Sequence, residues 1–299
     1  MTPLRIALSG ASGMLGGALL TALAADGHTL TRLLRRAPRG PGELRWDPAR
    51  GDLDAAALEG LDAVIHLSGE NIAAGRWNAA RKARLRTSRV GSSALLASRL
   101  ATCARPPRAL LCASAVGFYG DRGDERLDEG SAAGQGFFPA LCRDWEAAAS
   151  PAAAAGIRVV HLRFGVLLGA EGGALGRMLP IFRLGLGGPL GSGRQWLSWL
   201  SLEDATRAVR FALANESLAG PVNLVSPAPV RQRDFARALG RALHRPALLP
   251  APAFALRLLL GEMADAALLA SAAVHPGRLE AAGFTWRHPR LDDALADVL

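Results

Sequence analysis

Apolar and polar positions alternate in blocks along the first half of the chain. Short apolar runs typical of buried strands cover residues 4–10, 28–36, 61–69, 108–117 and 157–169. Helical patterns lie between several of these runs, over residues 14–27, 76–104 and 138–156. Strands that alternate with helices are connected by right-handed crossovers and pair into a parallel sheet. The pattern therefore predicts an α/β fold with a doubly wound parallel sheet.

The alternation of strand-like and helix-like segments becomes less regular after residue 169. Residues 184–196 are too rich in glycine for an ordinary helix or strand. Later segments read as helices at 201–215 and 232–244, a strand at 220–227, and terminal helical pieces at 279–286 and 291–299. Ser201 is the predicted N-cap of the first of these helices, because two acidic residues follow it in the first turn. We expect a core over residues 1–169 and a smaller α/β substrate lobe over residues 170–299, interleaved with the core.

Composition narrows the class of protein. The chain has 299 residues, 50% of them hydrophobic, which suits one large domain or two unequal ones. Its three cysteines are an odd number with no disulfide framework, so we expect reduced thiols in a cytoplasmic protein. The first residues lack the features of a signal peptide, and no apolar run approaches the roughly 18 residues of a membrane span. We expect no membrane partner.

The net charge of +9 raises nucleic acid or an anionic ligand as partners. The arginines are scattered, with no basic tail and no aromatic residues interleaved with them, so we expect no nucleic acid partner. Lys82 is the only lysine of the chain. We interpret the charge as an arginine-rich, solvated surface. The expected partner is a small-molecule substrate, and no metal site is predicted.

Three glycines follow the first predicted strand at every third position: Gly10, Gly13 and Gly16. Small residues between a strand and a helix allow a tight turn and let the backbone approach a pyrophosphate, which the helix N-terminus then binds. The spacing alone is a weak signal, but its place at the start of an alternating chain makes it strong. We predict a dinucleotide site here, to which Ser12 and Met14 also belong.

The end of the second predicted strand indicates which dinucleotide binds. An acidic residue there suits the ribose 2′-hydroxyl of NAD, whereas arginine suits the 2′-phosphate of NADP. The strand ends in Arg35 and Arg36, and no acidic residue stands beside them in the sequence. The predicted cofactor is therefore NADP(H).

Two further strand ends are expected at the same edge of the sheet, where ligands of open α/β sheets bind. Leu67, Ser68, Gly69 and Glu70 follow one strand, and Ser114 ends the next. We assign the first three to the cofactor site. His66 lies within an apolar run, and we expect it to be a hydrogen-bonded core residue.

At this point the chain resembles the extended short-chain dehydrogenases/reductases, in the segments 9–17, 62–72, 114–120 and 162–169. More narrowly, segments 172–200 and 275–284 resemble an atypical epimerase-like family with a small C-terminal extension and no assigned substrate. This resemblance covers nearly the whole chain. It implies a Rossmann-type core, NADP(H) binding, and a substrate cleft near the C-terminal lobe. Arg163, near the end of a predicted strand, is assigned to the cofactor site and could also face an anionic substrate.

The superfamily uses a Tyr-x-x-x-Lys pair, in which the lysine and the cofactor lower the pKa of the tyrosine so that it can exchange a proton. This chain has one tyrosine, Tyr119, and Gly123 stands four residues after it. With Glu146 as the anchor of the helix at 138–156, the superfamily's tyrosine falls on Phe138 and its lysine on Cys142. Neither side chain can perform the usual reaction.

Three other residues remain as catalytic candidates. Ser114 matches the superfamily's serine, Tyr119 matches a tyrosine beside the pocket of relatives, and Glu70 stands near the expected nicotinamide edge. Cys142 is either a reactive thiol or a small buried apolar residue. Glu70 is either a substrate ligand or proton carrier, or a loop carboxylate that accepts hydrogen bonds from backbone amides. Arginines in and around residues 177–196 could face a sugar nucleotide or another anionic carbonyl compound. The leading prediction is an NADP(H)-dependent oxidoreductase or epimerase-like enzyme, and the alternative is an NADP(H)-binding regulatory or redox-sensing protein without turnover.

Overall fold

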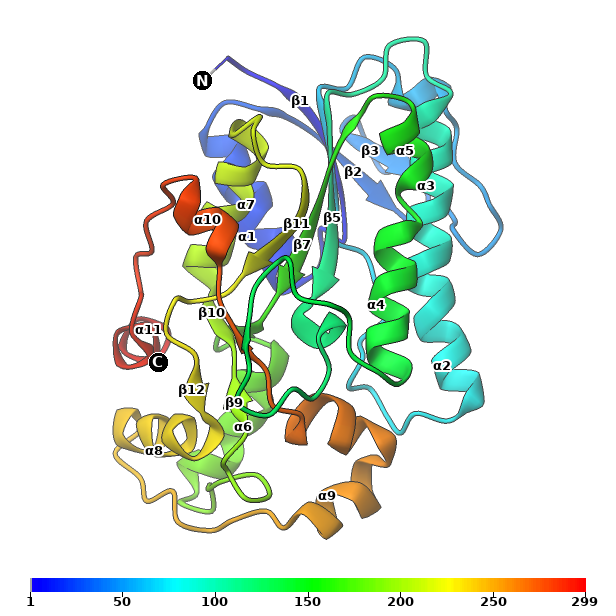
Figure 1. The fold of residues 1–299 in the computed structure, drawn as a ribbon. Helices are drawn as coiled ribbons and strands as arrows, with labels where there is room; N and C mark the ends of the chain where they lie inside the picture. The colour runs from blue at the N-terminus through cyan, green and yellow to red at the C-terminus, as the bar shows by residue number, and fades with distance from the viewer. Residues whose placement is uncertain (1) are drawn as a thin grey trace.

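The computed structural model describes residues 2–299 and contains a seven-stranded sheet in which all paired strands are parallel (Figure 1). Its order is β11-β7-β5-β4-β1-β2-β3. The strands are β1 (Arg5–Ser9), β2 (Thr29–Leu34), β3 (Glu43–Arg45), β4 (Ala63–His66), β5 (Ala109–Ala115), β7 (Arg158–Phe164) and β11 (Gly220–Leu224). The predicted doubly wound parallel sheet is confirmed. Because β2 and β4 lie on opposite sides of β1, the strand order reverses between β1 and β4, which is where such sheets bind ligands.

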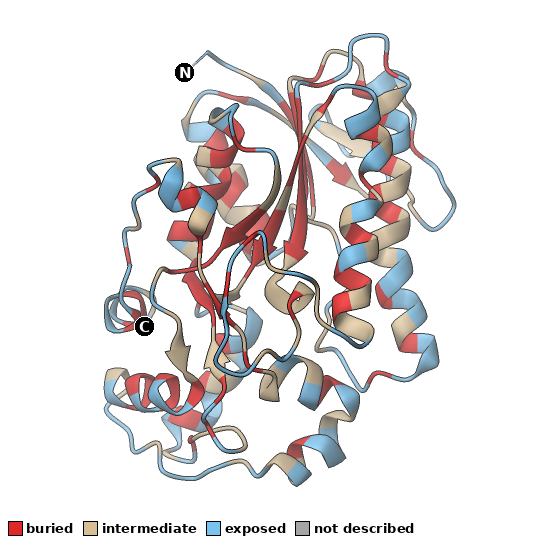
Figure 2. Cartoon of the chain, viewed as in Figure 1, coloured by how far each residue is buried: buried red, intermediate tan, exposed pale blue. Residues whose placement is uncertain are grey.

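Helices cover both faces of the sheet (Figure 1). On one face lie α1 (Met14–Ala25), α7 (Leu202–Ala214) and α10 (Gly277–Ala281). On the other lie α3 (Ser92–Ala101), α4 (Phe137–Ala147) and α5 (Ser150–Ala154), and α2 (Ala79–Arg86) runs into α3 through a π-helical turn, Thr87–Gly91. Buried residues gather on the strands and on the helix faces turned toward them (Figure 2).

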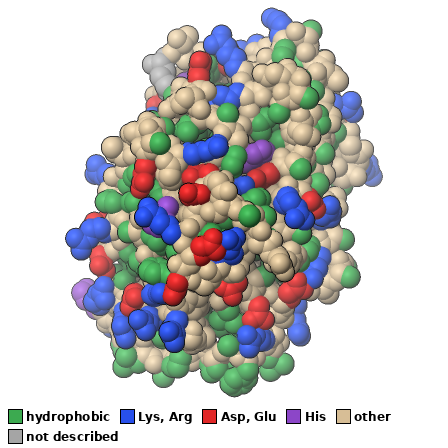
Figure 3. Space-filling view, in the orientation of Figure 1, with side chains coloured by type: hydrophobic (Ala, Val, Ile, Leu, Met, Phe, Trp, Pro, Cys, Tyr) green, Lys and Arg blue, Asp and Glu red, His purple; other side chains and the backbone are tan. Residues whose placement is uncertain are grey.

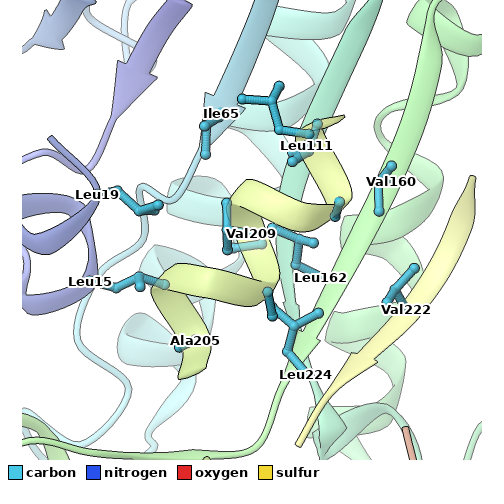
Figure 4. Close-up of a cluster of buried hydrophobic side chains, with 14 of the residues drawn as sticks. Leu15, Leu19, Ile65, Leu111, Val160, Leu162, Ala205, Val209, Val222 and Leu224 are labelled. Atoms are coloured by element: carbon cyan, nitrogen blue, oxygen red, sulfur yellow. The ribbon is translucent and has the colours of Figure 1, made fainter. Parts of the chain in front are cut away.

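The apolar pattern of α1 and α7 explains their position. Leu15 and Leu19 of α1 and Val209 of α7 are buried in one cluster with strand residues such as Ile65 and Leu162 (Figure 4). Each fully buried leucine or valine of this kind stabilises the fold by roughly 1.5–3 kcal/mol. This packing fixes the start of α1 beside the ends of β1 and β4.

Residues after 169 contribute to the sheet as well as to a smaller lobe. β11 is an edge strand of the main sheet and α7 packs on it, so residues 1–169 do not contain the whole sheet. The other elements lie mainly around the carboxyl ends of the strands (Figure 1). They are β6 (Arg126–Leu127), β8 (Val166–Leu168), α6 (Gly173–Arg183), β9 (Trp196–Leu197), β10 (Trp199–Ser201), β12 (Val230–Arg231), α8 (Gln232–Ala242), α9 (Ala253–Leu260), β13 (Ala273–Val274) and α11 (Leu291–Val298). Residues 184–195 form neither helix nor strand, as their glycines predict.

Two local predictions are confirmed. The Ser201 hydroxyl accepts a hydrogen bond of 3.1 Å from the Asp204 amide and so caps α7. His66 is fully buried, with its ring nitrogens 2.6 Å from the Ser9 hydroxyl and 3.0 Å from the Ser92 hydroxyl. Burial lowers the pKa of His66 to about 4, so its ring is neutral near pH 7. Across residues 2–299, no helix has the length and apolar character needed to cross a membrane.

Candidate dinucleotide and substrate site

The loop after β1 is packed too closely for side chains at two of its glycines. Gly10 has a φ of +76°, and a Cβ atom there would lie 2.8 Å from the backbone carbon of Leu67. A Cβ atom on Gly16 would lie 2.2 Å from the carbonyl oxygen of Gly10. The two glycines therefore let the β1 loop, the first turn of α1 and the β4 loop meet at the point where the strand order reverses.

The N-terminus of α1 is open. Gly13 is the N-cap, is exposed, and has no side chain to cap the first turn. The first amides of a helix have no partner within the helix, so these N–H groups and the helix dipole favour an anion. Ser12 is exposed beside Gly13, whereas the Met14 side chain points toward Gly169, where a Cβ atom would lie 2.4 Å from its sulfur. The backbone amide of Met14, and not its side chain, is therefore the group that can bind an anion.

The two arginines after β2 differ in their surroundings. Arg36 donates two hydrogen bonds of 2.8 and 2.7 Å to Glu43 of β3, which also accepts from Arg32 and from the Arg39 amide. The Arg36 guanidinium holds the pKa of Glu43 at about 2. Arg35 is exposed and makes no side-chain hydrogen bond or ion pair within residues 2–299. An acidic residue therefore does stand near this strand end, supplied by the neighbouring strand.

The loop after β4 is held by arginines from α2. Glu70 forms ion pairs with Arg81 and Arg84, and its amide donates a 3.1 Å hydrogen bond to the Ser88 hydroxyl. Ser68 and Gly69 lie at the surface beside it. The predicted role of Glu70 as a proton carrier or substrate ligand is not supported, because two guanidinium groups already bind its carboxylate. Its other predicted role, accepting from backbone amides, is not seen either.

A buried polar network joins the ends of β5 and β7 to α4. Ser114 donates a 2.7 Å hydrogen bond to Glu146, and Arg163 donates two of 2.8 Å to the same carboxylate. The side chains of Arg163 and Glu146 are only 4% and 12% exposed. Arg163 is thus used within the protein, which argues against its predicted contact with the cofactor. Ser114 is buried as well, at 3% exposed, but it lies at the carboxyl end of β5 and its hydroxyl oxygen can still accept a hydrogen bond.

Tyr119 belongs to the same network and has no exposed surface. Its hydroxyl donates a 2.7 Å hydrogen bond to Asn223 of β11 and accepts one of 3.0 Å from Arg163. Burial raises the pKa of Tyr119, which opposes formation of a phenolate. The buried hydroxyl, already bonded to two side chains, argues against the prediction that Tyr119 is a catalytic acid or base.

The positions of the missing Tyr and Lys are apolar. Phe138 packs over Gly117, where a Cβ atom would lie 2.4 Å from its ring, and against Trp77 with ring centroids 5.7 Å apart. Cys142 is fully buried, and burial raises the pKa of its thiol to about 12. A neutral, buried thiol is a poor nucleophile, which argues against Cys142 as a reactive cysteine.

The glycine-rich segment contributes less to a substrate site than its composition indicates. The Gln195 amide donates to two backbone carbonyl groups, and the Trp196 indole donates to Asp124. Arg177 donates a 2.7 Å hydrogen bond to the Ala73 carbonyl group, which ties α6 to the β4 loop. Arg194 and Arg183 are exposed and can meet an anion.

Two residues of this region were missed by the sequence analysis. Glu43 comes from another strand, so it had no local signal. Glu146 could have been found, because Phe138, Cys142 and Glu146 are spaced four residues apart and share one face of α4.

Two family patterns match the chain. The one described as the NAD dependent epimerase/dehydratase family matches residues 6–224, and the one described as a domain of unknown function (DUF1731) matches residues 251–298. The first spans the whole sheet and the polar network, and the second covers α9 to α11.

Relatives match over the full length. Epimerase family protein Mb2239 of Mycobacterium bovis is 47% identical over 97% of this chain and 96% of its own length. A crystal structure of human epimerase family protein SDR39U1 with NADPH is 35% identical, covers 99% of both chains and has a TM-score of 0.90. A structure of the nucleoside-diphosphate sugar epimerase from Corynebacterium glutamicum is also 35% identical, with a TM-score of 0.81; the match covers 99% of this chain and 58% of that one.

Proposed function

Because this chain belongs to the NAD dependent epimerase/dehydratase family, we propose that it binds NADP(H) where β1, β4 and α1 meet and reduces a small carbonyl compound. The observation that carries the proposal is the uncapped N-terminus of α1 at the reversal of the strand order. The NADPH bound to human SDR39U1 supports the choice of cofactor. The name of the Corynebacterium glutamicum protein supports sugar nucleotides as substrates to test.

Each group of residues has a task in this proposal. The amides of the first turn of α1 bind the pyrophosphate, and Arg35 binds the 2′-phosphate, joined by Arg36 if it leaves Glu43. NADPH supplies a hydride to the carbonyl carbon, and the resulting alkoxide then needs a proton. Phe138 and Cys142 cannot donate that proton, and Tyr119 and Glu70 are engaged elsewhere. Ser114 donates its own proton to Glu146, so it can accept a hydrogen bond from a water molecule but does not supply the proton itself. Solvent remains as the proton source, so we expect slow turnover.

NADPH should bind more tightly than NADH, and the preference should depend on the two arginines. A charge-assisted contact to the 2′-phosphate is worth about 1.5–3 kcal/mol, or roughly 10- to 100-fold in affinity. We expect the Arg35→Ala, Arg36→Ala variant to lose this preference in fluorescence titrations of both cofactors. Glu43→Gln is the matched variant that frees Arg36, and it should strengthen NADPH binding. Equal affinities of the wild type for NADPH and NADH would contradict the assignment.

Phe138→Tyr should raise the rate of NADPH oxidation with a carbonyl or sugar-nucleotide substrate. It adds a hydroxyl group at the position that matches the tyrosine of the short-chain dehydrogenase/reductase superfamily, and a positioned acid is worth about 10²–10⁴-fold in rate. Phe137→Tyr is the control, since it adds the same group to the neighbouring residue of α4. We expect at least a tenfold gain for Phe138→Tyr and no gain for Phe137→Tyr.

The second candidate is an NADP(H)-binding regulatory or redox-sensing protein without turnover. The apolar wall of Phe138 and Trp77 at the expected reaction site favours it. If wild type and Phe138→Tyr both bind NADPH and neither oxidises it with any substrate of the panel, this candidate replaces the enzyme. Measured turnover by the wild type would reject it.

A further inference from the structure

Arg89 is a buried cation in an unusual setting. It lies in the π-helical turn Thr87–Gly91 between α2 and α3, and it is only 9% exposed. One terminal nitrogen donates a 3.0 Å hydrogen bond to the Glu70 carbonyl oxygen, and the guanidinium carbon lies 5.2 Å from the centre of the Trp145 ring. The buried Nε–H group has no hydrogen-bond partner. The other terminal nitrogen lies 3.5 Å from the Ser88 hydroxyl, so the protein satisfies only part of the five N–H donors of this group.

No carboxylate of residues 2–299 is bonded to Arg89, and the nearby charge of Glu70 offsets only part of the effect of burial on its pKa. In the described part of the chain it makes no ion pair, because the carboxylate of Glu70, its nearest acidic neighbour in the loop, is taken by Arg81 and Arg84. Burial lowers the pKa of Arg89, but an arginine stays protonated in a protein at neutral pH. A buried charge without a partner is destabilising, so its presence calls for a compensating group that binds later.

The position of Arg89 indicates what that group is. A Cβ atom on Gly69 would lie 3.3 Å from the guanidinium carbon, so the missing side chain of an exposed glycine leaves this group close to the surface. Gly69 belongs to the loop after β4, which touches the glycine loop at the reversal of the strand order. The guanidinium group therefore lies directly behind Gly69, in the loop that borders the proposed dinucleotide site.

Cys142 of α4 lies close enough to Arg89 for each group to affect the pKa of the other. Burial raises the pKa of Cys142 to about 12, and the nearby Arg89 charge acts in the opposite direction. Cys142 occupies the position expected to hold the superfamily's lysine, and Lys82, the only lysine, is instead paired with Glu262. Arg89 is thus a buried cation beside the β4 loop that forms no ion pair within residues 2–299.

We propose that Arg89 is a binding residue for oxygen atoms of the bound dinucleotide, through its ribose hydroxyl or phosphate groups. Its charge comes from the turn between α2 and α3 and takes the place of a charge that α4 lacks. This inference rests on the proposed function, because it needs a dinucleotide at the reversal of the strand order. It goes further in naming the residue that supplies the positive charge under that dinucleotide.

The test is Arg89→Met, which keeps much of the side-chain volume and removes the charge. We expect the affinity for NADPH, measured by calorimetry, to fall about 10- to 100-fold. The melting temperature of the cofactor-free protein should stay the same or rise, because an uncompensated buried charge is gone. A merely structural arginine would show the reverse: a lower melting temperature and an unchanged affinity. Arg89→Lys, which keeps the charge, should retain more affinity than Arg89→Met.

The double variant Arg89→Met, Cys142→Lys should bind NADPH at least fivefold more tightly than Arg89→Met alone, because a cation then returns to this region from α4. Cys142→Met is the volume control and should restore none. In the wild-type background, Cys142→Lys should lower the melting temperature, since two cations would then face each other. If the wild type binds NADPH and Arg89→Met binds it equally well, the role of Arg89 is refuted and the proposed function stands. A wild type that binds no dinucleotide refutes both.

Discussion

Gly13→Asp should weaken NADPH binding at least 100-fold and leave the fold intact. Aspartate is a favourable N-cap, and the backbone of Gly13, with φ −80° and ψ 163°, suits it. Its carboxylate would accept hydrogen bonds from the amides that the pyrophosphate needs, and it would repel the phosphates. Like charges brought together at a binding site cost several kcal/mol, which corresponds to two or more decades of affinity. Calorimetric titration with NADPH measures the effect.

Gly13→Asn is the matched control, because it has the same shape and caps the same amides without a charge. We expect it to bind NADPH at least tenfold more tightly than Gly13→Asp. Both variants should melt at or above the wild-type temperature. By contrast, Gly10→Val should damage the fold, since its side chain would enter the backbone of Leu67. If Gly13→Asp binds NADPH with wild-type affinity, the N-terminus of α1 does not bind the pyrophosphate.

Glu146→Ala should lower the free energy of unfolding by about 3–5 kcal/mol, because it leaves the buried charge of Arg163 without a partner. Ser114 loses its acceptor in the same variant. The unfolding midpoint in urea measures the loss. Replacing both partners, as Glu146→Leu with Arg163→Met, should recover most of it, since no charge then remains buried.

Asp144→Ala is the control on the same helix. Asp144 pairs with Arg86 at 2.6 Å, but their side chains are 33% and 53% exposed, so water screens the pair. We expect a loss of less than about 1 kcal/mol. If Glu146→Ala is no more destabilising than Asp144→Ala, the network of Ser114, Glu146 and Arg163 does not hold the ends of β5 and β7 to α4.

The sheet and the cofactor loop could be predicted from the sequence because their signals are local. Apolar runs of the right length mark each long strand, and Gly10, Gly13 and Gly16 stand directly behind the first. The N-cap role of Ser201 follows from its next few residues in the same way. β11 was predicted as a strand, but its place beside β7 depends on a contact between residues more than 50 positions apart.

The roles of the polar residues could not be predicted, because partners far away in the sequence decide them. Tyr119 reads as a pocket residue until Asn223 and Arg163 surround its hydroxyl. Glu70 reads as a free carboxylate until α2 brings Arg81 to it. Arg36 reads as a free cation, yet Glu43 lies opposite on the next strand. In each case the sequence identified a residue with suitable chemistry. It did not show the distant residue that binds the side chain in the folded protein.

A crystal structure of the protein with NADPH tests the central claim most directly. The account predicts the pyrophosphate against the amides of the first turn of α1, the 2′-phosphate beside Arg35, and a ribose or phosphate oxygen within hydrogen-bond distance of Arg89. Crystals grown at saturating NADPH that show the cofactor elsewhere, or show none while the glycine loop is free of lattice contacts, would contradict it.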